Sequence, residues 1–79
     1  MIDVLVGKKV IGIKQASKAI NNGKGTALYV AEDAERKLII PLLELACSNN
    51  IKVIKIDTMR NLGKMCGIDV QSSATLILE

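Results

Sequence analysis

The sequence predicts an α/β fold in which helices cover both faces of a sheet, and three observations support this. Short runs rich in Val and Ile alternate with segments of helical periodicity. Residues 26–31 are almost continuously apolar, as expected of a strand that is buried on both faces. The 79 residues contain no linker, repeat or low-complexity segment, so residues 1–79 are expected to form one domain.

The first elements can be located from short-range patterns. Residues 2–6 are apolar and end at Gly7, which suggests one or two helical turns, and residues 9–11 suggest a short strand. A helix is predicted over 14–21, and Asn22-Gly23 supplies a left-handed stop. The apolar face of this helix is formed by Ile13, Ala16, Ala19 and Ile20.

The middle of the chain predicts a strand, a polar exit at 32–35 and a helix that runs to about Ser48. Pro41 fits best in the first turn of the regular part of this helix, and an earlier start would make Pro41 a kink. Asn49-Asn50 ends the helix. Its inner stripe is expected to contain Leu38, Leu42, Leu45 and Ala46.

The last third predicts a strand over 51–56, a short helix and a final strand over 74–78. Thr58 can cap the helix, which extends through Cys66. Gly67, with the apolar Ile68 behind it, makes a suitable C-terminal cap.

Composition narrows the possible functions. The net charge is +3, and residues 1–24 carry five lysines against Asp3 alone. This basic end indicates either an anionic partner or a solvated lysine face. With Tyr29 as the only aromatic residue, the chain cannot stack bases on any scale. There is no His, and Cys47 and Cys66 lack metal-ligand spacing, so we expect no metal or cofactor and interpret both cysteines as small buried residues.

Other features of the sequence argue against an enzyme and against a membrane protein. No phosphate-loop glycine pattern is present, and no nucleophile has a nearby base. The carboxylates are interpreted more simply as surface groups than as catalytic ones; they belong to Asp33, Glu35, Asp57 and Asp69. Without a signal peptide or a membrane-spanning stretch, a cytoplasmic protein is expected.

The first candidate segment is Gly12-Ile13-Lys14-Gln15-Ala16-Ser17-Lys18. Gly12 lets a ligand approach the backbone, and the free N–H groups of the first helical turn add positive potential. Lys14, Gln15 and Lys18 share one exposed face and can donate to phosphates and base edges. On residue types alone, an ordinary amphipathic helix with a solvated lysine face is the favoured explanation of the pattern.

The second candidate segment is the loop that starts at Gly67, in which Ile68 and Val70 flank Asp69 before Gln71-Ser72-Ser73. An exposed apolar pair could cover an unstacked base. Alternatively, both side chains could point into the core.

Taken together, the two segments resemble the kink-turn-binding ribosomal protein family of L-seven-Ae and L-thirty-e type, in particular its small bacterial members. The resemblance is carried by Gly12-x-Lys14-Gln15-x-x-Lys18 and Leu62-Gly63-Lys64-x-Cys66-Gly67-Ile68-Asp69-Val70, with Val30-Ala31-Glu32-Asp33-Ala34 between them. It implies a three-layer α-β-α sandwich with a mixed four-stranded sheet. It also implies recognition of kink-turns, which are RNA duplexes bent at a bulge beside tandem sheared G·A pairs.

The resemblance places Gly12, Lys14, Gln15 and Lys18 against the G·A pairs, and Ile68, Asp69 and Val70 over the flipped-out bulge nucleotide. Archaeal members carry Asn and Glu where this chain has Lys14 and Gln15. Gln71-Ser72-Ser73 replaces the family's usual Gly-Ala-Ala, so Gln71 either weakens binding or adds a polar contact. Asn21 and Asn22 replace residues that are often charged.

The sequence therefore predicts a non-catalytic, monomeric RNA-binding protein, ribosome-associated or bound to a kink-turn in another structured RNA. The alternative is a protein-interaction or auxiliary ribosomal module on the same fold, without kink-turn binding.

Overall fold

The computed structural model describes residues 8–68 and 70–78, so the apolar stretch expected at residues 2–6, its closing Gly7 and the candidate residue Asp69 lie outside the described residues. In this part of the chain, four strands alternate with three helices. In chain order the elements are β1 (Lys9–Ile11), α1 (Ile13–Asn21), β2 (Ala27–Ala31), α2 (Arg36–Ser48), β3 (Lys52–Ile56), α3 (Met59–Met65) and β4 (Ala74–Ile77).

The strands form one mixed sheet in the order β1-β4-β2-β3. β4 is antiparallel to both β1 and β2, whereas β2 and β3 are parallel. In the central pair, Leu28 lies opposite Leu76 and Tyr29 opposite Thr75. The mixed four-stranded sheet is therefore confirmed.

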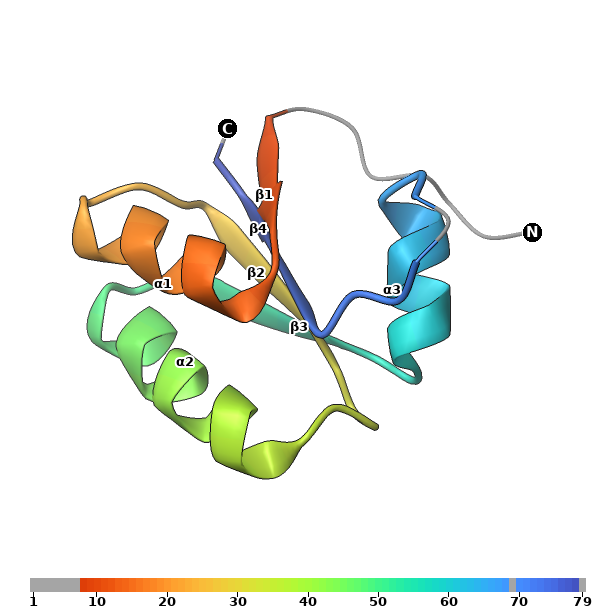
Figure 1. The fold of residues 1–79 in the computed structure, drawn as a ribbon. Helices are drawn as coiled ribbons and strands as arrows, with labels where there is room; N and C mark the ends of the chain where they lie inside the picture. Colours follow the sequence, from red (N-terminus) through yellow and green to blue (C-terminus); the bar gives the residue numbers. More distant parts are fainter. Residues whose placement is uncertain (1–7, 69, 79) are drawn as a thin grey trace.

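Helices α1 and α2 lie on one side of the sheet and α3 on the other (Figure 1). Leu28 and Leu76 are fully buried in the layer between the sheet and the helices, where Ile20 of α1 and Leu42 of α2 also lie. On the other side of the sheet, α3 packs against the strands, and its Leu62 is fully buried. The three-layer α-β-α sandwich is thus confirmed. None of the helices in the described part of the chain is long and apolar enough to cross a membrane.

All three helices end in the same way, at a residue of positive φ. The backbone N–H groups of this residue and of the next one donate the two hydrogen bonds that close the last turn. In α3, Gly67 N donates to Lys64 O (3.0 Å) and Ile68 N donates to Gly63 O (3.2 Å). The stops predicted at the ends of the three helices are confirmed, and the positive-φ residues are Gly23, Asn50 and Gly67.

The prediction for α2 was wrong in two respects. The helix begins at Arg36, so Pro41 lies in its interior rather than in its first turn. Leu38 is 52% exposed instead of buried, and Ile39 takes its place on the inner stripe beside Leu42 and Ala46. Cys47, one residue beyond that stripe, is exposed rather than buried, whereas Cys66 is buried as expected.

Candidate nucleic-acid interface

Gly12 links β1 to α1 in a conformation that side-chain-bearing residues rarely adopt, with φ 107° and ψ 153°. Its N–H donates to Ala74 O (2.8 Å), and its carbonyl accepts from Ala16 N (2.9 Å), which starts the helix. No side chain caps α1, and nothing lies within 4 Å of the position that a Cβ at Gly12 would occupy. Backbone N–H groups at this helix start are therefore open to a ligand.

Lys14, Gln15 and Lys18 are exposed, while Ala16 and Ile20 on the other side of α1 are buried. The predicted division between an inner apolar face and an outer polar face is confirmed. No carboxylate lies in the first turn of α1, so its start keeps a positive potential.

The two apolar candidate residues of the loop after α3, Ile68 and Val70, differ in exposure. Val70 is 68% exposed, and Gln71 is exposed beside it. Ile68 is half-buried and packs against the core, so it supports the loop more than it displays an apolar surface. Val70 and Gln71 thus carry the exposed side chains of this candidate segment among its described residues.

Gly63 explains how this loop can lie against α3. A Cβ at Gly63 would overlap the carbonyl oxygen of Val70 and would lie 3.2 Å from the Cα of Gln71. A glycine in a helix interior costs about 1 kcal/mol relative to alanine. Here it allows the backbone of the loop to approach the helix closely.

Ser72 and Ser73 hold the base of the loop. Ser72 is buried, and its Oγ donates to Ala74 O (3.0 Å) and lies 3.0 Å from Thr75 Oγ1, which in turn lies 3.0 Å from Cys66 Sγ. Ser72 N donates to Met59 O (3.1 Å), and Ser73 Oγ lies 3.4 Å from Met59 Sδ. The buried side-chain polar groups among the described residues are all paired, so these serines fit the core.

The sheet brings the two candidate segments to the same edge. The loop leads directly into β4, whose first residue, Ala74, accepts the hydrogen bond from Gly12 N. Ala31 N at the end of β2 donates to Ser73 O (3.0 Å), and Asp33 Oδ1 accepts from Met59 N (2.7 Å) at the start of α3. The start of α1 and the loop after α3 are thus adjacent in space.

Two basic residues beside the loop were missed by the sequence analysis. Arg60 and Lys64 are exposed on α3 and lie one helical turn apart. With the loop they line a surface hollow of about 410 Å³, formed by Arg60, Lys64, Ile68, Val70 and Gln71. Their spacing of four residues on a predicted helix was the signal that could have found them.

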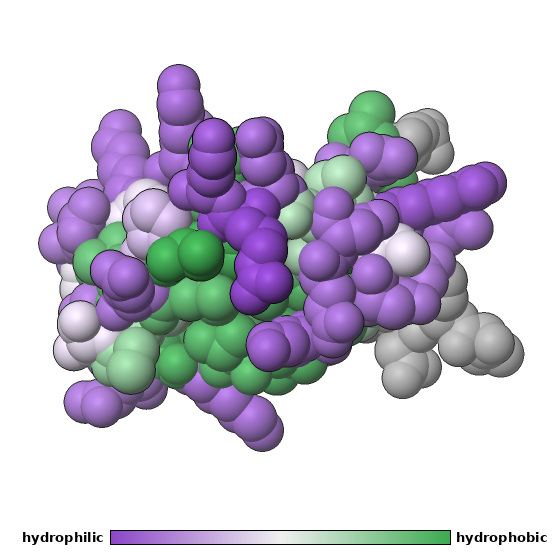
Figure 2. All heavy atoms as spheres, turned by 90° about the horizontal axis from the view of Figure 1, so that it is seen from below, coloured by the Kyte–Doolittle hydropathy of each residue, from purple (hydrophilic) through white to green (hydrophobic). Residues whose placement is uncertain are grey.

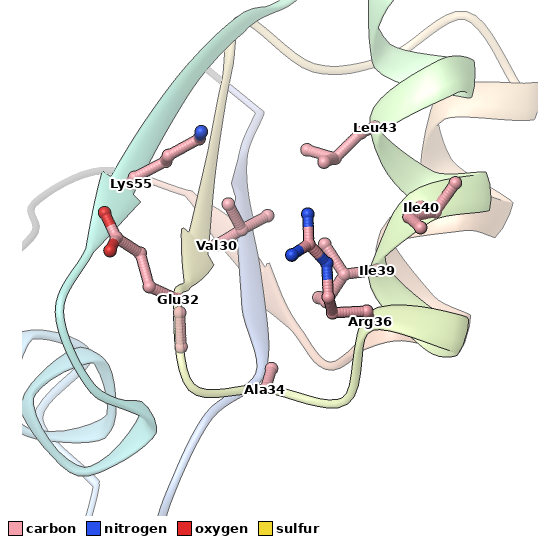
Figure 3. A pocket seen from close by; sticks show the side chains of 9 residues that line it. Val30, Glu32, Ala34, Arg36, Ile39, Ile40, Leu43 and Lys55 are labelled. Carbon is pink, nitrogen blue, oxygen red and sulfur yellow. The ribbon is translucent and has the colours of Figure 1, made fainter.

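A second hollow, of about 250 Å³, lies between α2 and the ends of β2 and β3 (Figure 3). Its wall is mixed: the apolar Val30, Ile39 and Leu43 line it together with charged side chains from Glu32 and Lys55. The Arg36 guanidinium extends toward it from the start of α2. Figure 2 shows an apolar surface ringed by hydrophilic side chains on this side of the molecule. The spacing of the apolar residues did not predict the exposure of Leu38 on α2, because it placed Leu38 in the core.

Within residues 8–68 and 70–78, no cluster of three or more His, Cys, Asp or Glu side chains could hold a metal ion. The polar groups of the interface are instead lysines, an arginine, glutamines and open backbone amides. Such groups donate hydrogen bonds to phosphates and base edges.

Comparison with known proteins gives a consistent result. Residues 4–79 match the model of the ribosomal protein L7Ae/L30e/S12e/Gadd45 family. An RNA-binding protein of Caldanaerobacter subterraneus subsp. tengcongensis is 46% identical over 63 residues, which cover 80% of this chain and 77% of that protein. The RNA-binding protein YbxF of Geobacillus stearothermophilus is 43% identical over 72 residues, or 91% of this chain and 88% of that one.

The fold also matches a solved structure, that of the Giardia lamblia 15.5kD RNA binding protein. The TM-score is 0.84 at 22% sequence identity, and the match covers 90% of this chain and 60% of that protein. At this level of identity, the match concerns the fold alone.

Proposed function

Because the chain belongs to the ribosomal protein L7Ae/L30e/S12e/Gadd45 family, we propose that it is a non-catalytic RNA-binding protein that recognises kink-turns, most simply in the cytoplasm and in association with the ribosome. Two relatives that are more than 40% identical are RNA-binding proteins, which supports the RNA partner. The observation that carries the kink-turn proposal is the hydrogen bond from Gly12 N to Ala74 O. It joins the two candidate segments at one edge of the sheet.

In the proposed complex, α1 reads the bases. The major groove of regular A-form RNA is too narrow for side chains, but a kink beside sheared G·A pairs opens it. The exposed Lys14, Gln15 and Lys18 would donate to base edges there, and the RNA backbone would approach Gly12, where no side chain intervenes.

The loop after α3 would complete recognition. Val70, exposed and held by close packing on Gly63, would cover the unstacked bulge nucleotide, and Gln71 would add a polar contact. Together with Ile68 and Asp69, these residues make up the proposed second half of the site. Because the protein would bind only the bent RNA, binding would stabilise the kink.

The test compares a generic kink-turn RNA with the same duplex in which Watson–Crick pairs replace the G·A pairs. At about 0.15 M salt, non-specific attraction of lysines to RNA is largely screened. Tight binding to the kink-turn alone is the expected result. Equal affinity for the two RNAs would refute kink-turn recognition.

A second candidate function is a protein-interaction module on the same fold. It is favoured by Leu38 and Ile40, which are 52% and 45% exposed on α2. Binding of a protein partner that persists at high salt, together with no binding to kinked RNA, would support this alternative.

A further inference from the structure

The hollow beside α3 is lined partly by the loop proposed to cover the bulged nucleotide, but its two basic residues, Arg60 and Lys64, lie outside the segments assigned to the bases. We propose that it is a second RNA subsite, in which Arg60 and Lys64 hold phosphates of the strand that carries the bulged nucleotide. This inference rests on the proposed function and extends it to the opposite side of the sheet from α1.

The geometry supports a phosphate ligand. Arg60 and Lys64 project from the same face of α3, and the hollow between them and the loop opens beside Val70. None of the described residues that line the hollow is acidic, and no described carboxylate pairs with either cation. Two cations that no carboxylate among the described residues pairs with, beside an open hollow, attract an anion, and a guanidinium can bind phosphate oxygens in bidentate fashion.

The position of the hollow indicates which part of the RNA it would meet. Val70 and Gln71 form its wall and also belong to the proposed cover of the bulged nucleotide. A base held against Val70 brings its own flanking phosphates to that wall. Because Gly63 fixes the loop on α3, the distance between Val70 and the two cations is set by packing rather than by loop motion.

Gln71 has a distinct role in this arrangement. It is exposed at the edge of the hollow, where its amide can donate to a phosphate oxygen next to the two cations. Gln71 thus adds a donor to the subsite, whereas Ser72 and Ser73 serve the core.

The test measures the salt dependence of kink-turn RNA binding for the full chain and for Arg60→Ala, Lys64→Ala and Arg60→Gln. Loss of one phosphate contact should lower the slope of log K against log salt by about one, and affinity should fall about fivefold at 0.15 M salt. The loss should be similar for kink-turns of different base sequence, because phosphates carry no sequence information.

Lys37→Ala and Lys52→Ala are matched controls, because both lysines are exposed and lie away from the hollow, on α2 and at the start of β3. They should leave the slope unchanged. A neutral methylphosphonate at the bulge should weaken wild-type binding by a similar factor and should have no further effect on Arg60→Ala.

Several outcomes would overturn the inference. If wild-type protein selects the kink-turn but the Arg60 and Lys64 variants keep its slope, the subsite is wrong and the proposed function stands. If wild-type protein does not select the kink-turn, the proposed function fails, and this inference fails with it. If the same variants instead lose binding to an acidic protein segment, the hollow serves a protein partner. Circular dichroism of each variant establishes that the fold is retained.

Discussion

Gly63→Ala tests the relation between the fold and the proposed RNA surface. In a free helix this substitution would stabilise by about 1 kcal/mol, because glycine is a poor helix former. Here the new Cβ would overlap Val70 O and would lie 3.1 Å from the carbon of that carbonyl. Both atoms belong to the backbone, so no rotamer change can relieve the overlap.

Overpacking of this kind costs about 1–3 kcal/mol, and more where the backbone must move. We therefore expect a net loss of about 1–2 kcal/mol, which corresponds to a melting temperature lower by about 5–15 °C for a domain of this size. Displacement of Val70 and Gln71 should also reduce affinity for kink-turn RNA by at least about tenfold. Thermal unfolding and RNA titration measure the two effects on the same preparation.

Gly67→Ala is the matched control. Gly67 has a φ of 74°, and nothing lies within 4 Å of its Cβ position, so alanine would meet backbone strain without a clash. That strain costs about 1–2 kcal/mol, similar to the loss expected for Gly63→Ala, but it should affect RNA affinity much less. A Gly63→Ala protein that is more stable than wild type and binds RNA equally well would refute the reasoning.

Three further predictions concern single side chains. Val70→Asp should leave the fold intact, because Val70 is 68% exposed, but should weaken RNA binding about tenfold or more by charge repulsion; an unfolded variant would place Val70 in the core. Lys18→Ala should cost about 1–3 kcal/mol of RNA affinity if Lys18 reads a base, and an equal loss for RNA without G·A pairs would make it a phosphate contact. Thr58→Ala should lower the free energy of unfolding in urea by about 1 kcal/mol, because Thr58 Oγ1 accepts from Asn61 N (3.0 Å) at the start of α3; no change would show that this cap is dispensable.

Short-range chemistry accounts for the part of the fold that was predictable. The stops at Gly23, Asn50 and Gly67 depend on residues that tolerate positive φ, and Thr58 caps a helix through its own neighbours. The exposure of Lys14 also follows from helical periodicity within α1. Such features depend on few residues and can be inferred without knowledge of the rest of the fold.

Features that depend on distant contacts were not predictable in the same way. Around Pro41, α2 is apolar on more than one side, so periodicity alone allows either Leu38 or Ile39 on the inner stripe. Packing of α2 on α1 and β3 decides for Ile39. Gly63 likewise has its role only because the loop folds back over α3. The sequence shows the glycine, but it does not show that the backbone of Val70 will lie against it.

The central claim is that residues 12–18 and the loop after α3 form one RNA-binding surface. Titration of the ¹⁵N-labelled protein with kink-turn RNA, followed by amide chemical shifts, tests this claim most directly. We predict that the largest changes occur at Gly12 to Lys18 and at Gly67 to Ser72, and that the outer face of α2 around Leu38 and Ile40 changes little. Changes confined to α2, with neither segment affected, would contradict the claim.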